Sequence, residues 1–408
     1  MTAHILHAEL VVPDPVDEAI ADGAVLVADG RIESVGTYQE IRRQAPPQTP
    51  VHDFPGATVL PGLIDCHVHL ALSGESDAVA RLDASDDRTL LLAMAGRAQE
   101  LLDSGVTTVR DLGDRDGLAV ALRDAVARGE LPGPRVLAAC APVTVTGGHC
   151  WYFGGQADGP EEIRAVVRRN VQAGADVIKV MATGGGLTPD GPAPWTAQFT
   201  ESEVRVAVAE ARRFGRQVAA HVHGTAGVKT ALAAGVDTLE HCSFMPPPGP
   251  VRGPDGAAAE LIKQIAADGI AVCPTFSSVL SESVRRIGES GVQPWLDLVT
   301  HQYEQGVRLL AGTDAGIPGA GFGRYVDGLE WFARAGLDNT AVLAAATSSA
   351  ADALGIGHRT GRLRAGLEAD LLVVEGDPRT ELAALRRGLL VLARGRAHRP
   401  RPQLGGPA

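Results

Sequence analysis

The stretch Val59–Leu70, VLPGLIDCHVHL, places two histidines one residue apart at the end of an apolar run. If this run is a strand, its side chains alternate between two faces, so His67 and His69 point to one side while Cys66 and Val68 point to the other. Two imidazoles on one face can bind one metal ion, or can be hydrogen-bonded polar residues near a strand end. The choice depends on whether other strands supply further ligands.

Seven more short apolar runs follow this one, with longer helical patterns between them. The eight predicted strands are residues 63–70, 106–112, 135–140, 176–182, 217–224, 237–243, 270–275 and 307–314. The predicted helices include Glu161–Ala173, Glu201–Phe214 and Ala258–Ala267. In SGVTTV, AGADVI, AGVDTL and DGIAV a glycine follows a helical pattern and precedes a strand, as helix C-caps do. Eight strand–helix units predict a (β/α)8 TIM barrel, whereas a doubly wound sheet, the alternative, does not require eight.

The two ends of the chain have a different pattern. Residues 1–58 contain short alternating segments with the turn signal ADGR, and residues 360–396 again have the pattern of strands and turns. Neither segment could bury a core alone. We therefore expect residues 1–58 and 360–400 to form one composite β-domain packed against the barrel, which takes residues 59–359. The Pro/Gly-rich end, residues 401–408, is expected to be a disordered tail.

Composition excludes several classes of partner. The chain has 37 Lys and Arg against 49 Asp and Glu, a net charge of −12, and its only dense basic cluster lies near the C-terminus. Nucleic acid and anionic membranes are therefore not expected partners. The 5 cysteines are scattered and contain no C-x-x-C pair, which argues against disulfides and a cysteine zinc site. With no signal-peptide pattern and no apolar span, a cytoplasmic location is expected.

Side chains that can bind metal recur at the ends of five predicted strands. They are His67, His69, Lys179, His221, His223, His241 and Asp314. The carboxyl ends of barrel strands face the active site, so these side chains would meet there. Singly, each has a structural interpretation, such as a hydrogen-bonded core histidine or a helix N-cap. Chance placement of the whole set at strand ends is improbable, and the set predicts a metal centre.

Lys179 lies inside the apolar strand DVIKVM, where an unpaired ammonium is costly. A buried lysine either finds an anion or loses its charge through a lowered pKa. The uncharged amine can react with carbon dioxide to give a carbamate, whose two oxygens could bridge two metal ions. The sequence itself shows only a lysine whose surroundings require an explanation.

Taken together, PGLIDCHVHL, IKVMATGG, AAHVHG, TLEHCS and AGTDAG resemble the amidohydrolase superfamily. The similarity is closest to its imidazolonepropionase-like and prolidase-like branch, which includes Xaa-Pro dipeptidases and metal-dependent carboxypeptidases. It covers nearly the whole chain, including GLEADLLVVEGDP, which resembles the β-sandwich domain of the superfamily. The resemblance implies an α/β fold with a TIM barrel, a smaller β-sandwich built from both termini, and a site for two divalent metal ions, expected to be Zn2+.

The resemblance also implies a role for each strand-end residue. His67, His69 and Asp314 would bind the more buried metal, and His221 and His241 the second. Lys179, as N6-carboxylysine, would bridge the two. A water between two zinc ions would be hydroxide near neutral pH, and Asp314 would accept its proton and pass it to the leaving nitrogen. His223 shares a strand face with His221 and would be a catalytic or substrate-binding residue.

Substrate contacts are predicted in two loops. The long segment after Lys179 contains TGGGL, where Gly185 could offer a backbone N–H to an anion, and Trp195, which could wall a pocket or lie on the surface. The segment after the third strand contains His149, which resembles a substrate-contacting position of prolidase-like relatives, and Tyr152. Arg110 is expected either near the barrel mouth or paired with Asp111 or Asp114.

These inferences predict a cytoplasmic, metal-dependent amidohydrolase that cleaves a dipeptide or an N-acyl amino acid with a free carboxylate, by attack of a metal-bridged hydroxide. Hydrolysis of a cyclic amide of the imidazolonepropionase type is the alternative. Mononuclear deaminases fit less well, because they do not use a lysine on the fourth strand. A non-catalytic scaffold would be expected to have lost ligands. The expected partners are a small-molecule substrate and further copies of the chain in a homo-oligomer.

Overall fold

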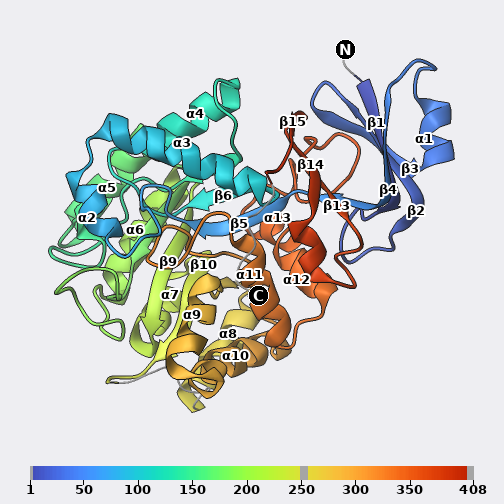
Figure 1. Cartoon of the computed structure of the whole chain (residues 1–408). Coiled ribbons are helices and arrows are strands. Elements are labelled where there is room, and N and C mark those ends of the chain that lie inside the picture. Colours follow the sequence, from blue (N-terminus) through green and yellow to red (C-terminus); the bar gives the residue numbers. More distant parts are fainter. Residues whose placement is uncertain (1–2, 249–255, 402–408) are drawn as a thin grey trace.

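The computed structural model describes residues 3–248 and 256–401, and it shows a mixed α/β fold (Figure 1). Each of the eight predicted internal strands is present. They are β5 (Leu63–Val68), β6 (Val106–Asp111), β7 (Arg135–Ala138), β8 (Val177–Met181), β9 (Gln217–Gly224), β10 (Thr238–Met245), β11 (Ala271–Cys273) and β12 (Arg308–Leu309). The last is shorter than predicted, although the backbone beyond it still pairs, since Asp314 N–H donates to the His67 carbonyl at 2.8 Å.

The eight strands pair in parallel within two sheets. One sheet has the order β12-β11-β10-β9-β8 and the other has the order β5-β6-β7. Single parallel bridges, Val68 with Ala315 and Val143 with Val180, link the two sheets at both sides. Because the ladders form two separate sheets, a closed (β/α)8 barrel stays a prediction.

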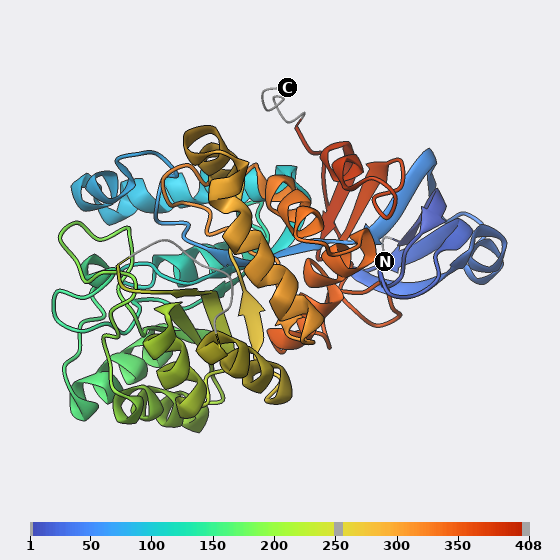
Figure 2. The ribbon, with the colours of Figure 1, turned by 90° about the horizontal axis from the view of Figure 1, so that it is seen from below.

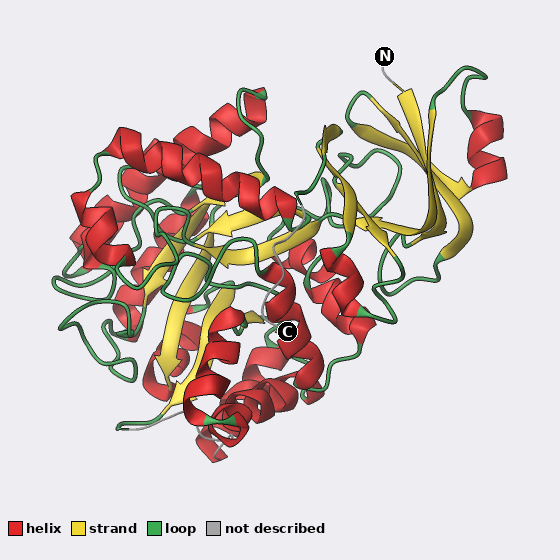
Figure 3. Cartoon of the chain, viewed as in Figure 1, coloured by secondary structure: helices red, strands yellow, loops and turns green. Residues whose placement is uncertain are grey.

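The predicted helices are confirmed as α5 (Pro160–Ala173), α6 (Glu201–Arg213) and α8 (Gly256–Ala267). Gly174 ends α5 with a φ of 102°, a conformation that favours glycine. The other helices are α1 (Tyr38–Gln44), α2 (Ala78–Ala84), α3 (Asp87–Asp103), α4 (Leu118–Arg128), α7 (Thr225–Ala234), α9 (Ser278–Ile287), α10 (Glu289–Glu304), α11 (Tyr325–Arg334), α12 (Asn339–Ala345) and α13 (Ser348–Ala353), with short 3-10 turns η1 (Trp151–Phe153) and η2 (Leu382–Arg386). Most of them surround the parallel strands, whereas α1 packs against β2 and β3 (Figure 3).

Segments from both ends of the chain form a separate sheet at one side of the molecule (Figures 1 and 2). Its strands, in the order β15-β14-β13-β4-β1-β2-β3, are β1 (Ala3–Val11), β2 (Ile20–Ala28), β3 (Arg31–Thr37), β4 (Val51–Pro61), β13 (Leu371–Glu375), β14 (Gly388–Ala393) and β15 (Arg396–His398). The pairing of the two ends is thus as predicted. All seven strands belong to one sheet, so the two stacked sheets of a sandwich stay a prediction.

The stretch quoted first joins the two parts of the fold. Its first residues end β4 in the terminal sheet, and its last residues form β5 in the parallel sheet. Cys66 and Val68 pack into apolar clusters, whereas His67 and His69 line a pocket, so the alternation predicted for this strand is confirmed. Arg135 on β7 reinforces the junction, because its guanidinium lies 2.7 Å from carboxylate oxygens of Glu368 and Asp370.

Within residues 3–248 and 256–401, we find no helix that combines the length and the apolar character needed to span a membrane. The predicted disordered tail, residues 401–408, lies outside the described residues except for Arg401.

Candidate metal centre

A pocket of about 420 Å³ lies where the carboxyl ends of the parallel strands meet, and it brings most of the predicted site residues together. Those that line it are His67, His69, His149, Lys179, His221, His223, His241 and Asp314. They come from β5, β8, β9 and β10 and from segments that follow β5, β7 and β12. Carboxyl ends of parallel strands are the usual place for an active site in such folds.

The first group of candidate ligands consists of His67, His69 and Asp314. The Nε2 atoms of both histidines lie 3.4 Å from Oδ1 of Asp314. That oxygen is buried and has no hydrogen-bond partner among the described residues. Two ring nitrogens and an unsatisfied carboxylate oxygen around one point form a donor set that suits a divalent cation such as zinc.

Hydrogen bonds at Nδ1 orient the two histidine rings of the first group. Nδ1 of His67 donates to Oε2 of Glu240 at 2.9 Å, and Nδ1 of His69 donates to the Gly113 carbonyl at 3.3 Å. A hydrogen bond at Nδ1 fixes the tautomer and leaves Nε2 as the metal-binding atom. The local structure therefore presents the required nitrogen of each ring to Asp314.

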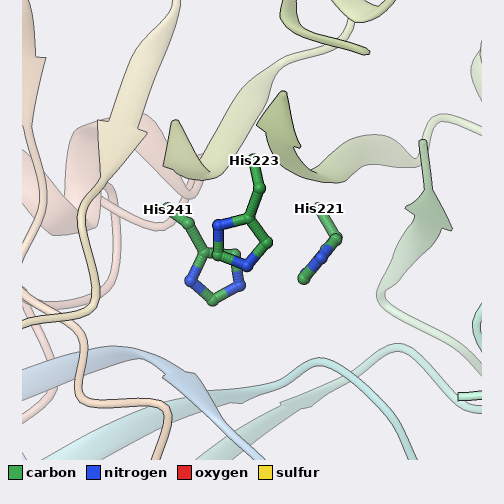
Figure 4. Close-up of side chains that lie close together, drawn as sticks. All are labelled: His221, His223 and His241. Carbon is green, nitrogen blue, oxygen red and sulfur yellow. The ribbon is translucent and has the colours of Figure 1, made fainter. Parts of the chain in front are cut away.

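The second group consists of His221, His223 and His241, whose rings lie together in Figure 4. The rings of His223 and His241 are stacked with centroids 4.5 Å apart, and His221 meets each of them edge-on, at 4.7 and 4.6 Å. One nitrogen from each ring lies within 4.8 Å of the others. The alternation of β9 thus brings His221 and His223 to one side, as predicted, but the geometry does not separate a ligand from a neighbour.

In each histidine of the second group, one ring nitrogen is hydrogen-bonded and the other is left available to a metal ion. Nε2 of His221 donates to the Gly184 carbonyl at 3.0 Å, which leaves Nδ1 to face the pocket. Nδ1 of His241 lies 2.8 Å from Thr275 Oγ1, and Nδ1 of His223 lies 2.9 Å from Ser243 Oγ, so Nε2 remains in both. Burial lowers the pKa of His223 to about 4 and that of His69 to about 3, so these rings are neutral at pH 7 and can bind metal without first losing a proton.

Lys179 is fully buried on β8 and lines the same pocket. Its Nζ has no hydrogen-bond partner among the described residues, and burial lowers the pKa of the amine. A fully buried donor without a partner is costly. Lys179 Nζ and Asp314 Oδ1, both without a partner among the described residues, therefore line one pocket with five neutral histidines, a set of side chains that can hold divalent metal.

Asp314 lies in the segment that follows β12 and has a constrained backbone conformation, with a φ of 57°. Burial raises the pKa of its carboxyl to about 7. A carboxyl group with a pKa near neutral can both accept and release a proton at pH 7. This is the behaviour required of an acid–base residue.

The predicted substrate contacts have different outcomes. His149 lines the pocket, and its ring Nδ1 lies 3.0 Å from Thr188 Oγ1 in the long loop after β8. Gly185 does not line the pocket; a Cβ there would clash with the His149 ring, so glycine is needed for close packing. Tyr152 and Trp195 are also absent from the lining residues. The hydroxyl of Tyr152 instead lies 3.5 Å from Cys150 Sγ.

Sequence reasoning missed a buried pair beneath the first group. Arg110 on β6 donates to Oε1 of Glu240 at 2.8 Å and to the Cys66 carbonyl at 2.7 Å. The predicted pairing of Arg110 with Asp111 or Asp114 is wrong, because the guanidinium crosses the interior toward β10. Glu240, the glutamate in TLEHCS, could have been found from the sequence, because like Lys179 it is a charged residue inside an apolar strand and so needs a buried partner.

Replacing Glu240 should weaken metal binding. In Glu240→Gln the group that accepts from His67 loses its charge, and loss of such an outer partner typically lowers metal affinity about 10–100-fold. We expect this loss when affinity is measured by competition with a chelator of known affinity.

Glu210→Gln is the matched control, because Glu210 is also a buried, ion-paired glutamate but lies on α6 outside the pocket. It is expected to lower the melting temperature without changing metal affinity. Equal affinities of Glu240→Gln and the wild type would show that Glu240 serves only the fold.

A family profile decides the assignment suggested by this geometry. The profile described as the amidohydrolase family matches residues 58–393, which is most of the chain. The chain belongs to the amidohydrolase family. A second profile, described as an imidazolonepropionase-like composite domain of bacteria, matches residues 23–47 of this amidohydrolase. The superfamily resemblance drawn from the motifs is thereby confirmed.

Full-length similarities extend the family match. Ochratoxinase from Aspergillus niger is 31% identical over 417 aligned residues, which cover 92% of this amidohydrolase and 81% of the ochratoxinase. Its crystal structure aligns with a TM-score of 0.83 over 99% of this chain and 97% of that one. A Xaa-Pro dipeptidase crystallised with methionine in its active site aligns with a TM-score of 0.85 at 28% identity, over 97% and 100% of the two chains. The protein is therefore an amidohydrolase-type hydrolase.

Proposed function

We propose that this amidohydrolase cleaves an amide bond in a dipeptide or an N-acyl amino acid, and that it does so with two divalent metal ions, zinc being the natural choice. The observation that carries the proposal is the meeting of two ligand groups, His67/His69/Asp314 and His221/His223/His241, with the partnerless Lys179 in one pocket. The names of the similar proteins support the amide class, because they include a Xaa-Pro dipeptidase and a prolidase.

In this proposal His67, His69 and Asp314 would hold one cation and His221 and His241 the other, and Lys179, as N6-carboxylysine, would supply an anionic ligand to both. Two bound cations would supply polarisation of the amide carbonyl and acidification of a water molecule. Asp314 accepts the proton of the attacking water and delivers it to the leaving nitrogen. His223 and His149 face the same space and are placed to hydrogen-bond the substrate.

The architecture proposed for this function is one (β/α)8 barrel over residues 59–359, with residues 1–58 and 360–400 forming a composite β-sandwich domain. The two bridges between the parallel sheets support closure of the barrel. The single sheet formed by both ends supports the composite domain. A homo-oligomer in the cytoplasm stays a prediction for this chain.

Cyclic-amide hydrolysis is the second candidate. The profile match at residues 23–47 favours it, as does 32% identity over 167 residues to imidazolonepropionase from Aromatoleum aromaticum, which covers 38% of that enzyme. The pocket supports the linear amide more strongly, because its lining continues well beyond the metal centre.

Metal content and turnover test the proposal together. Carefully purified protein, reconstituted with zinc and bicarbonate, is expected to contain about two metal ions per chain by elemental analysis. The same preparation is then screened against dipeptides, N-acyl amino acids and imidazolonepropionate. One metal or none after reconstitution would count against the binuclear site, and turnover of imidazolonepropionate alone would favour the second candidate.

A further inference from the structure

The pocket has two chemically different ends. One end is the metal centre, where Lys179 and Asp314 are the only lysine, arginine or acidic side chains among the described residues that line the pocket. The other end is an apolar wall that we define by Phe276, Val279, Leu280, Trp295, Leu298 and Val299. These residues follow β11 or belong to helices α9 and α10, which the chain inserts between β11 and β12.

The wall is supported from behind and is therefore preformed. The ring of Phe276 packs against Phe332 of α11 with centroids 5.1 Å apart. The indole N–H of Trp331 donates to Ser281 of α9 at 3.2 Å. Leu298 and Val299 are buried, whereas Leu280 and Trp295 are only partly buried although both pack against the core. Partly buried apolar side chains that line a hollow offer contact area to a ligand.

We infer that the site selects substrates in which one of the two groups beside the scissile amide is large and apolar, either aromatic or branched aliphatic, and lies against the α9–α10 wall. This inference rests on the proposed function and specifies its substrate. Among the described lining residues, the polar groups at or beside the wall are neutral, namely the indole N–H of Trp295 and hydroxyls such as those of Ser277 and Ser283. A charged group there would therefore be desolvated without an ionic partner. An apolar group gains affinity by leaving water, about fourfold for each buried methylene.

Leu280 is the residue best placed to test the wall, because it lines the pocket and is not fully buried. Leu280→Trp fills space at the wall, and Leu280→Ser removes apolar contact with little steric risk. Leu92→Trp is the matched control, since Leu92 is 76% exposed on α3 and does not line the pocket. None of these residues belongs to the metal centre.

The probes are acetohydroxamic, benzohydroxamic and naphthohydroxamic acids, which share a metal-chelating group and differ in apolar size. Calorimetry with zinc-loaded protein should show affinity rising at least tenfold from the first to the last for the wild type and Leu92→Trp. Leu280→Trp and Leu280→Ser should lose most of this increase while binding acetohydroxamic acid within about twofold of the wild type. Matched N-acetyl and N-naphthoyl amino acids, assayed for hydrolysis, should rank in the same order.

Each outcome is decisive for one of the two proposals. Two results would overturn the inference that the wall selects apolar groups and would leave the proposed function standing. One is amide turnover that does not depend on apolar size. The other is a rise in hydroxamate affinity with apolar size that is as large in both Leu280 variants as in the wild type. A size-dependent, Leu280-dependent affinity without turnover of any amide would support the wall and overturn the proposed function.

Discussion

Asp314→Asn is expected to keep the fold and to lose turnover. The amide oxygen of asparagine can still face the metal site, but it cannot accept the proton of the attacking water. Loss of a positioned general base lowers kcat/KM by about 10²–10⁴-fold. Initial rates on a substrate identified in the screen, with metal content measured on the same preparations, provide the test. Substantial residual turnover with unchanged metal content would remove Asp314 from this role.

The stability of Asp314→Asn should separate a catalytic effect from misfolding. Burial raises the pKa of this carboxyl to about 7, so in the metal-free protein its charged form opposes folding above the ordinary pKa of an aspartate. Asparagine removes that cost, and the metal-free variant should melt no lower than the metal-free wild type at pH 8. Asp268→Asn, an exposed position after α8, is the matched control and should change neither rate nor melting temperature.

Lys179→Ala is expected to lose both metal and activity. Two adjacent dications repel each other, and an anionic bridge is needed to hold them at short range. Loss of a residue that only hydrogen-bonds to a ligand lowers metal affinity by up to about 100-fold. Removal of a bridging ligand itself should lower it by more than that. Chelator competition measures the affinity. Lys263→Ala, at an exposed ion-paired lysine of α8, is the control and should bind metal like the wild type.

Rescue distinguishes the carbamate from a purely structural lysine. Formate, acetate or propionate could enter the space left by Lys179→Ala and supply two carboxylate oxygens, so partial return of metal and activity is expected. Lys179→Arg should fail, because a guanidinium stays protonated and cannot take up carbon dioxide. Lys179→Glu should retain weak metal binding through a carboxylate of shorter reach. Absence of rescue by every acid, with Lys179→Arg as active as the wild type, would contradict the carbamate.

Much of the fold could be predicted because the decisive signals are local. Alternation along β5 placed His67 and His69 on one face, and glycines such as Gly174 marked the ends of helices. The candidate ligands could be predicted as a set, since parallel strands bring their carboxyl ends to one place whatever the details of the loops.

The parts that escaped prediction depend on contacts between distant segments. Glu240 and Arg110 lie 130 residues apart, and only the path of β6 and β10 through the interior shows that they pair beneath His67. The apolar residues of α9 and α10 form a helical stripe that is indistinguishable in sequence from one that packs into a core. Which of them face a hollow is determined by the packing of neighbouring helices.

The central claim is that two metal ions share an anionic bridge at Lys179. The most direct measurement is a crystal structure of the zinc-loaded protein prepared with bicarbonate, with anomalous scattering recorded at the zinc edge. We predict two anomalous peaks, one beside His67, His69 and Asp314 and one beside His221 and His241, with carbamate density on Nζ of Lys179 between them. A single peak, or a bare amine that points away from the metals, would contradict the account.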